Sequence, residues 1–307
     1  MNYKVRHLTT YHYSQTVGFA RCALRLSPQQ SQDQDVLTYA VEISPTPSRL
    51  ETRVGQFGER IATAIIETPH QELRIDVAFD VAVNRPALLS GLGDGPWEAV
   101  REAASASLSL ETLSPANFIY PTALTRPHAA ITAYVAETFW PGRSIFEAAR
   151  DLTFRIKAEF AYEPGATHVS TPAIDAFNAR RGVCQDFAHV MISGLRGLGL
   201  PAAYVSGYLR TVPKPGKPRL QGADATHAWV ALWCGQALGW VGFDPTNALI
   251  VANDHIVLAV GRDYADVAPI SGVVLGPGEQ TIDVAVDVTP MDPAFAFERH
   301  AAGSSAW

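Results

Sequence analysis

Cys184 stands at the start of a segment whose apolar residues follow a helical spacing. The residues that recur at steps of four, four and three positions are Phe187, Met191, Leu195 and Leu198. This spacing predicts a buried helix that begins near Cys184 and ends at Gly199, just before Pro201. Because the first turn of a helix offers unpaired N–H groups and the positive end of the helix dipole, a thiolate is favoured there. Cys184 is therefore a candidate nucleophile.

A base for this thiol has to come from outside the helix. His189 is the nearest histidine in sequence, but five residues along a helix correspond to a rotation of about 140°. Its side chain is predicted to point away from Cys184 and to have a structural role. Asp186 lies in the same turn as Cys184, and its negative charge opposes a thiolate. A neighbouring base is needed all the more.

His227 is the candidate base, and Asp244 is the candidate residue that orients it. His227 opens a strand-like run, His227–Trp233, and a second run, Trp240–Asp244, follows a glycine-containing turn. The pattern predicts a β-hairpin. A two-residue loop sets His227 directly opposite Asp244, whereas a four-residue loop makes them diagonal neighbours on one face. In either register Asp244 can orient the imidazole of His227.

A cysteine at a helix start, with histidine and aspartate on neighbouring strands, is the arrangement of a thiol acyl-transfer triad. Each signal alone is weak, because a histidine among apolar residues is more often part of the core. An aspartate before Pro245 more often starts a turn. Together, Cys184, His227 and Asp244 predict a nucleophile, a base and the group that orients the base.

The remaining cysteines and the acidic residues indicate no metal or cofactor. Cys22, Cys184 and Cys234 are far apart and form no CxxC pair, so neither a disulfide framework nor a cysteine-rich zinc site is predicted. Cys22 and Cys234 are expected to be buried thiols. The sequence has no HExxH motif and no EF-hand loop, which argues against a metallohydrolase and against calcium dependence.

Composition excludes several function classes. The chain has 307 residues, of which 47% are hydrophobic and 18% charged, as expected of a folded protein of about two domains. A net charge of −6 without a basic run argues against nucleic-acid binding. No apolar run reaches the length of a membrane helix, and the N-terminus lacks a signal-peptide core. A soluble, cytoplasmic protein is expected.

The pattern along the chain predicts an α+β organisation. Residues 1–85 alternate apolar and polar side chains, which indicates an antiparallel β-sandwich or barrel. Residues 86–127 are predicted to be a connector. Residues 128–290 combine helices and strands in a catalytic core, and residues 291–307 are expected to form a tail.

Several motifs resemble those of the bacterial transglutaminase-like, cysteine protease family. The stretches that carry the resemblance in the core are Gly182–His189, Tyr204–Leu209, His227–Trp229, Gly239–Trp240 and Asp244–Asn247. Residues 3–83 are similar to the β-rich region that precedes this core, and His255-Ile256 with Gly261–Val267 looks like its C-terminal signature. One turn departs from the family, with Gln56 and Glu59 where Asp and Asn are common.

The resemblance implies a papain-like core in which a helix with Cys184 packs on an antiparallel sheet with His227 and Asp244. It assigns Cys184 as nucleophile, His227 as general base and then acid, and Asp244 as the orienting group. The oxyanion would be bound by the backbone N–H of Cys184 and one upstream donor. Further candidates for oxyanion or substrate contacts are Tyr162, Gln185 and Trp229. Arg262 and Asp263 are expected to form a local ion pair.

Three activities are compatible with this triad. Attack on an amide of a peptide or protein gives an acyl-thioester, and water would then make the protein a cysteine peptidase or amidase. An amine acceptor would make it a protein-glutamine transglutaminase. A peptide- or protein-binding module with the same fold and no catalysis is the third alternative. Hydrolysis is favoured, because the resemblance is to a family of proteases and because no segment suggests an amine tunnel. No oligomeric state is predicted.

Overall fold

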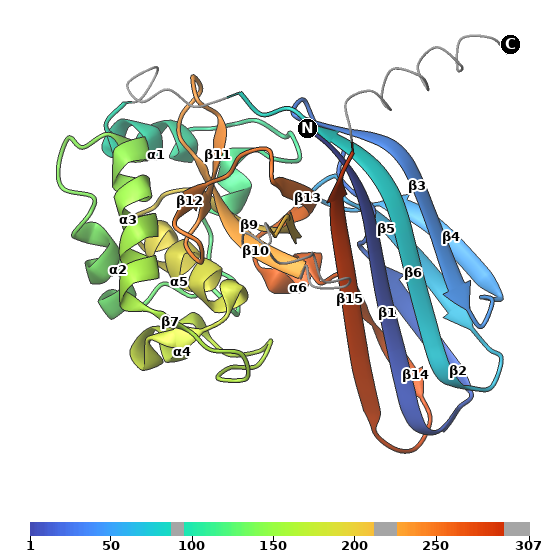
Figure 1. Ribbon diagram of the computed structural model, residues 1–307. Coiled ribbons are helices and arrows are strands. Elements are labelled where there is room, and N and C mark those ends of the chain that lie inside the picture. The colour runs from blue at the N-terminus through green and yellow to red at the C-terminus, as the bar shows by residue number, and fades with distance from the viewer. Residues whose placement is uncertain (87–94, 212–225, 292–307) are drawn as a thin grey trace, which may run out of the picture.

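The fold has two parts that lie side by side, a β-sandwich and a core of helices and strands (Figure 1). It is taken from a computed structural model, which describes residues 1–86, 95–211 and 226–291. Within these ranges no helix combines the length and the apolar character needed to cross a bilayer.

The β-sandwich consists of two four-stranded antiparallel sheets, ordered β15-β1-β6-β3 and β14-β2-β5-β4. Alternation of side chains produces its core, as in β6, where Leu73, Ile75, Val77, Phe79 and Val81 are buried. The strands are β1 (Asn2–Val17), β2 (Phe19–Leu24), β3 (Gln34–Ser44), β4 (Arg49–Val54), β5 (Arg60–Ile66), β6 (His70–Val83), β14 (Ile270–Leu275) and β15 (Gln280–Pro290).

The last two strands do not lie where the sequence-based division puts them. Residues up to 290 are predicted to belong to the catalytic core, but β15 pairs with β1 and β14 pairs with β2. Strand pattern alone does not identify the partner of a strand, so the return of the chain to the sandwich is not visible in the sequence. The sandwich is therefore built from both ends of the described chain.

The core has a five-stranded antiparallel sheet in the order β12-β11-β10-β9-β13. Its strands are β9 (Ala202–Leu209), β10 (Thr226–Trp233), β11 (Trp240–Asp244), β12 (Leu249–Ile250) and β13 (His255–Gly261). The helices are α1 (Trp97–Ser105), η1 (Pro115–Phe118), α2 (Ala129–Ala136), α3 (Ile145–Glu159), α4 (Ala173–Ala179), α5 (Cys184–Gly197) and α6 (Tyr264–Val267). Two short strands, β7 (Ala161–Tyr162) and β8 (Arg181–Gly182), pair in parallel.

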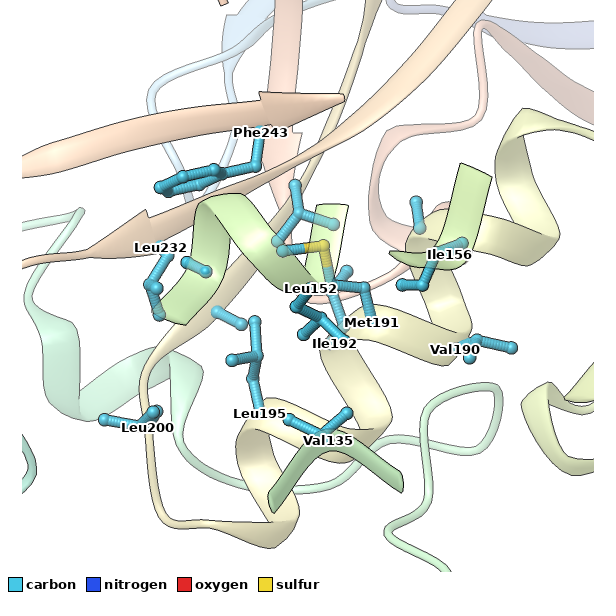
Figure 2. Packing of buried hydrophobic residues seen from close by; sticks show 14 of the residues in the cluster. Val135, Leu152, Ile156, Val190, Met191, Ile192, Leu195, Leu200, Leu232 and Phe243 are labelled. Atoms are coloured by element: carbon cyan, nitrogen blue, oxygen red, sulfur yellow. The ribbon is translucent and has the colours of Figure 1, made fainter. Parts of the chain in front are cut away.

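Helix α5 is the centre of this core. It starts at Cys184 as predicted and ends two residues before the expected Gly199. Figure 2 shows Met191, Ile192 and Leu195 of α5 packed among side chains of the neighbouring helices and of β10 and β11, including Leu152 and Phe243. Burial on all sides fixes α5, and with it the position of Cys184.

The segment predicted to be a connector is partly structured. Helix α1 lies within it, and Trp97, Val100 and Ala104 of α1 are buried in the same hydrophobic cluster as α5. Residues 87–94 of this segment, and residues 292–307 of the predicted tail, lie outside the described residues.

Candidate active site

Cys184 is the first residue of α5, and the turn before it is shaped by Asp186. The Asp186 carboxylate accepts hydrogen bonds from Val183 N at 2.8 Å and Thr167 Oγ1 at 2.6 Å. A Cβ on Gly182 would lie 2.4 Å from the same oxygen, so this approach requires glycine. The negative charge of Asp186, which opposes a thiolate at Cys184, thus caps the helix and stabilises its first turn.

The β10–β11 hairpin brings His227 and Asp244 together. Val230 pairs with Phe243 and Trp233 with Trp240, which is the register of the four-residue loop. His227 and Asp244 are consequently diagonal neighbours, and His227 Nε2 lies 2.8 Å from Asp244 Oδ2. The side chain of His227 is only 10% exposed.

Cys184 also interacts with this imidazole. Burial alone would lower the pKa of His227, but hydrogen bonds to Asp244 and Cys184, together with their negative charges, outweigh it and raise the pKa to about 10. Since Nε2 is taken by Asp244, Nδ1 is the ring nitrogen left for the sulfur. The cysteine, the histidine and the carboxylate are thus in the order Cys184, His227, Asp244, with the imidazole between the other two side chains.

Asp244 is fully buried and accepts hydrogen bonds at both oxygens. Oδ1 accepts from the backbone N–H of Thr246 at 3.0 Å and of Asn247 at 3.2 Å, and Oδ2 accepts from Asn247 Nδ2 at 2.8 Å. Burial opposes the carboxylate charge, but the bonds from His227, His255 and Asn247 dominate and hold the pKa well below its ordinary value. The turn that Asp244-Pro245 starts is therefore the same structure that keeps the carboxylate ionised.

His255 is a member of the site that the sequence analysis does not identify. It begins β13, is 2% exposed, and its Nε2 lies 3.3 Å from Asp244 Oδ2. The only signal in the sequence is the His255-Ile256 step of the C-terminal signature, to which no role is attached. Spacing along the chain cannot reveal it, because β13 and β11 are separated in the sheet by two strands.

The two histidines and Asp244 have the donor types of a metal site. One ring nitrogen of each histidine and a carboxylate oxygen lie within 4.8 Å of one another. Direct hydrogen bonds of both rings to Asp244 Oδ2 account for this convergence. We therefore describe the cluster as a hydrogen-bonded network.

The three further candidates differ in placement. Tyr162 is 52% exposed and stands beside Phe187; burial raises its pKa, and an electrostatic interaction with Cys184 adds to this shift. Gln185 is buried, and its Nε2 donates to Val169 O at 2.9 Å. Trp229 is 1% exposed and its ring packs edge-on against that of His255.

The contacts of His189 and Arg262 test two further expectations from the sequence. His189 points away from the site, is fully buried, and accepts from Tyr264 N at 3.2 Å; burial lowers its pKa to about 4. Arg262 does not pair with Asp263 as predicted. It binds Asp266 at 2.8 Å, while Asp263 caps α6.

Comparison with known proteins assigns both parts of the chain. Residues 3–82 match the bacterial transglutaminase-like N-terminal region, and residues 132–245 match the transglutaminase-like superfamily. An uncharacterized protein of Mycobacterium tuberculosis is 41% identical over 298 residues, covering 94% of this chain and 93% of its own. One from Mycobacterium leprae is 32% identical, covering 93% of this chain and 98% of its own.

Two further proteins are similar. A protein-glutamine gamma-glutamyltransferase of Pseudomonas aeruginosa is 34% identical over 126 residues, which is 36% of this chain and 18% of that protein. The crystal structure of a candidate cysteine protease from Cytophaga hutchinsonii superposes with a TM-score of 0.73 at 20% identity, over 95% of this chain and 92% of the other. The fold is thus α+β, with a papain-like core. The chain belongs to the bacterial transglutaminase-like family.

Proposed function

We propose that the protein is a thiol-dependent acyl-transfer enzyme that acts on amide bonds of peptides or proteins. The observation that carries the proposal is the 2.8 Å contact between His227 Nε2 and Asp244 Oδ2, together with the interaction of the same imidazole with Cys184. Such a pair keeps the sulfur anionic and supplies a proton for the leaving amine.

The reaction follows from these positions. The Cys184 thiolate attacks the amide carbonyl carbon, and the backbone N–H of Cys184 at the start of α5 stabilises the oxyanion, with the Tyr162 hydroxyl as the second donor. His227 donates its proton to the nitrogen as the C–N bond breaks, which leaves an acyl-thioester. Neutral His227 then takes a proton from the acceptor that attacks the thioester, and the thiolate is released.

Water is the acceptor we favour, which makes the protein a cysteine peptidase or amidase. Cys184 is only partly buried, and Tyr162 beside it is half exposed, so water reaches the thioester. The second candidate is transfer to an amine, as in a protein-glutamine transglutaminase. It is supported by the named Pseudomonas relative, whose similarity covers a third of this chain. A binding module without catalysis is the third.

Mass spectrometry of intact protein distinguishes the three. The full chain is incubated with peptide libraries, with and without a primary amine, and examined for an acyl adduct on Cys184. Cleaved peptides without incorporated amine indicate hydrolysis, and peptides that have gained the amine indicate transfer. If wild type forms no more adduct than Cys184→Ala, the proposal of an acyl-transfer enzyme is wrong.

A further inference from the structure

One oxygen of the buried carboxylate serves two histidines. Asp244 Oδ2 accepts from His227 Nε2 at 2.8 Å, from Asn247 Nδ2 at 2.8 Å, and from His255 Nε2 at 3.3 Å. Donors that share one acceptor divide its charge, so a bond to one weakens the electrostatic hold on the others. Whatever fixes His255 therefore affects how strongly Asp244 binds His227.

His255 shares this oxygen as a neutral ring. It faces Asp244 on β11, His227 on β10 and Arg85 after β6, with the ring of Trp229 at 5.2 Å. Burial, and the positive charges of His227 and Arg85, lower the pKa of His255 despite its bond to Asp244. Its Nδ1 has no hydrogen-bond partner among the residues that the structure describes, which favours Nε2 as the nitrogen that carries the proton and donates.

The β-sandwich holds the segment that carries His255. Arg85 Nη1 donates to the carbonyl oxygens of His255 at 2.5 Å and Ala252 at 2.8 Å. Gln34 of β3 makes two bonds with Val257, each of 2.8 Å: Nε2 donates to Val257 O, and Oε1 accepts from Val257 N.

Tyr3 of β1 adds a further contact, because its hydroxyl donates to Asp254 Oδ1 at 2.7 Å. The contacts made by Arg85, Gln34 and Tyr3 are together called the clamp. Residues next to His255 on both sides are thus fixed by the sandwich, while none of these contacts reaches the catalytic cysteine. The clamp acts on the position of one side chain in the site.

We propose that His255 is a positioning residue that shares Asp244 with His227 and so limits the basicity of the catalytic imidazolium, and that the β-sandwich keeps it in place. The inference rests on the proposed function, because it gives His255 an effect only through His227. An imidazolium that is held too tightly is a poorer acid toward the leaving amine. The β-sandwich then contributes to the active site by holding His255 in position.

The test measures the ionisation of His227 directly. Full-length protein with ¹³Cε1-labelled histidine is titrated by NMR, and the His227 resonance is assigned from its loss in His227→Gln. We expect His255→Leu, which lacks a donor, to move the His227 midpoint upward by about half a pH unit. His255→Gln, whose amide reaches the same oxygen, should restore the wild-type midpoint.

Gln34→Leu tests the clamp without touching the site. It should shift the His227 midpoint in the same direction by a smaller amount, whereas Thr38→Val should leave it unchanged. Thr38 is the matched control, because it also lies on β3 and accepts a hydrogen bond, from Asp80 N, away from β13.

The outcomes separate this inference from the proposed function. If His255→Leu is folded and its His227 midpoint equals or falls below that of wild type, or if His255→Gln behaves like His255→Leu, the positioning role is wrong. Alkylation of wild-type Cys184 by iodoacetamide at pH 6 is measured in parallel. A Cys184 no more reactive than a free model thiol argues against the proposed function, whatever the histidine variants do.

Discussion

The sulfur of Cys184 differs from the other two thiols in both exposure and neighbours. Cys22 and Cys234 are buried, 4% and 1% exposed, and burial raises the pKa of Cys22. Cys184 is partly exposed and interacts with a histidine whose pKa is raised to about 10. Reactivity at mildly acidic pH should therefore be confined to Cys184.

We expect iodoacetamide at pH 6 to modify Cys184 at least about tenfold faster than Cys22 or Cys234 in the folded protein, because only Cys184 has an imidazolium beside it. Peptide mapping by mass spectrometry gives the three rates. His227→Gln is the control for exposure: it should slow the modification of Cys184 severalfold while leaving the other two rates as they are. Equal rates in this variant and wild type would show that exposure alone explains the reactivity.

Replacing Asp244 by asparagine tests the orienting carboxylate. The hydrogen bond to its carboxylate is the largest of the influences that raise the pKa of His227 against burial, and its charge adds to the effect. In Asp244→Asn the imidazolium should therefore lose its proton at a lower pH, below the wild-type value of about 10. The acid needed by the leaving amine is then missing over more of the neutral range. We expect acyl transfer to fall by about 10²- to 10⁴-fold. The rate of adduct formation is measured as a function of pH. The prediction is contradicted if the rate falls at the same alkaline pH in Asp244→Asn as in wild type.

At the scale of elements, the start of α5 depends on one carboxylate. Asp186→Ala removes the acceptor for Val183 N and Thr167 Oγ1, which should lower the free energy of unfolding by about 1–2 kcal/mol. Urea unfolding measures the change. Asp175→Ala is the matched control, since Asp175 is exposed in the first turn of α4 and should cost less than about 0.5 kcal/mol. Equal losses in the two variants would mean that the cap contributes nothing specific.

Elements with a local signal could be predicted from the sequence, and their assembly could not. The helical spacing after Cys184 and the hairpin from His227 to Asp244 depend on neighbours in sequence, so periodicity predicts both. The pairing of β14 and β15 with the sandwich depends on partners more than 200 residues away. His255 was missed for the same reason, since its role comes from a contact across the sheet.

For the whole molecule, the junction between sandwich and core contains a buried histidine. His7 of β1 bonds to Tyr208 Oη of β9 at 2.7 Å and to Thr9 Oγ1 at 2.8 Å. Burial lowers the pKa of His7 to about 4, from an ordinary 6.5. In the unfolded chain this ring takes up a proton as the pH falls below 6.5, whereas in the folded chain it stays neutral until about pH 4. The folded state therefore loses stability across that window.

We expect the free energy of unfolding to fall between pH 6.5 and 4, with His7 contributing about 3 kcal/mol. Burial lowers the pKa of His189 to about 4 as well and also lowers the pKa of His255, so His7→Gln should remove less than half of the loss. Thermal unfolding followed over this pH range gives the slopes. A wild-type stability that does not change between pH 6.5 and 4 would contradict the assignment.

The pairing of β1 with β15 has a consequence for biosynthesis. During synthesis β1 can pair with β6 before the core is made, but its other neighbour, β15, is made only after the whole core has emerged. Until then β1 and β2 present open edges to the cytosol or to a chaperone. A nascent chain halted before Ile270 should be prone to aggregation even where its core has already folded.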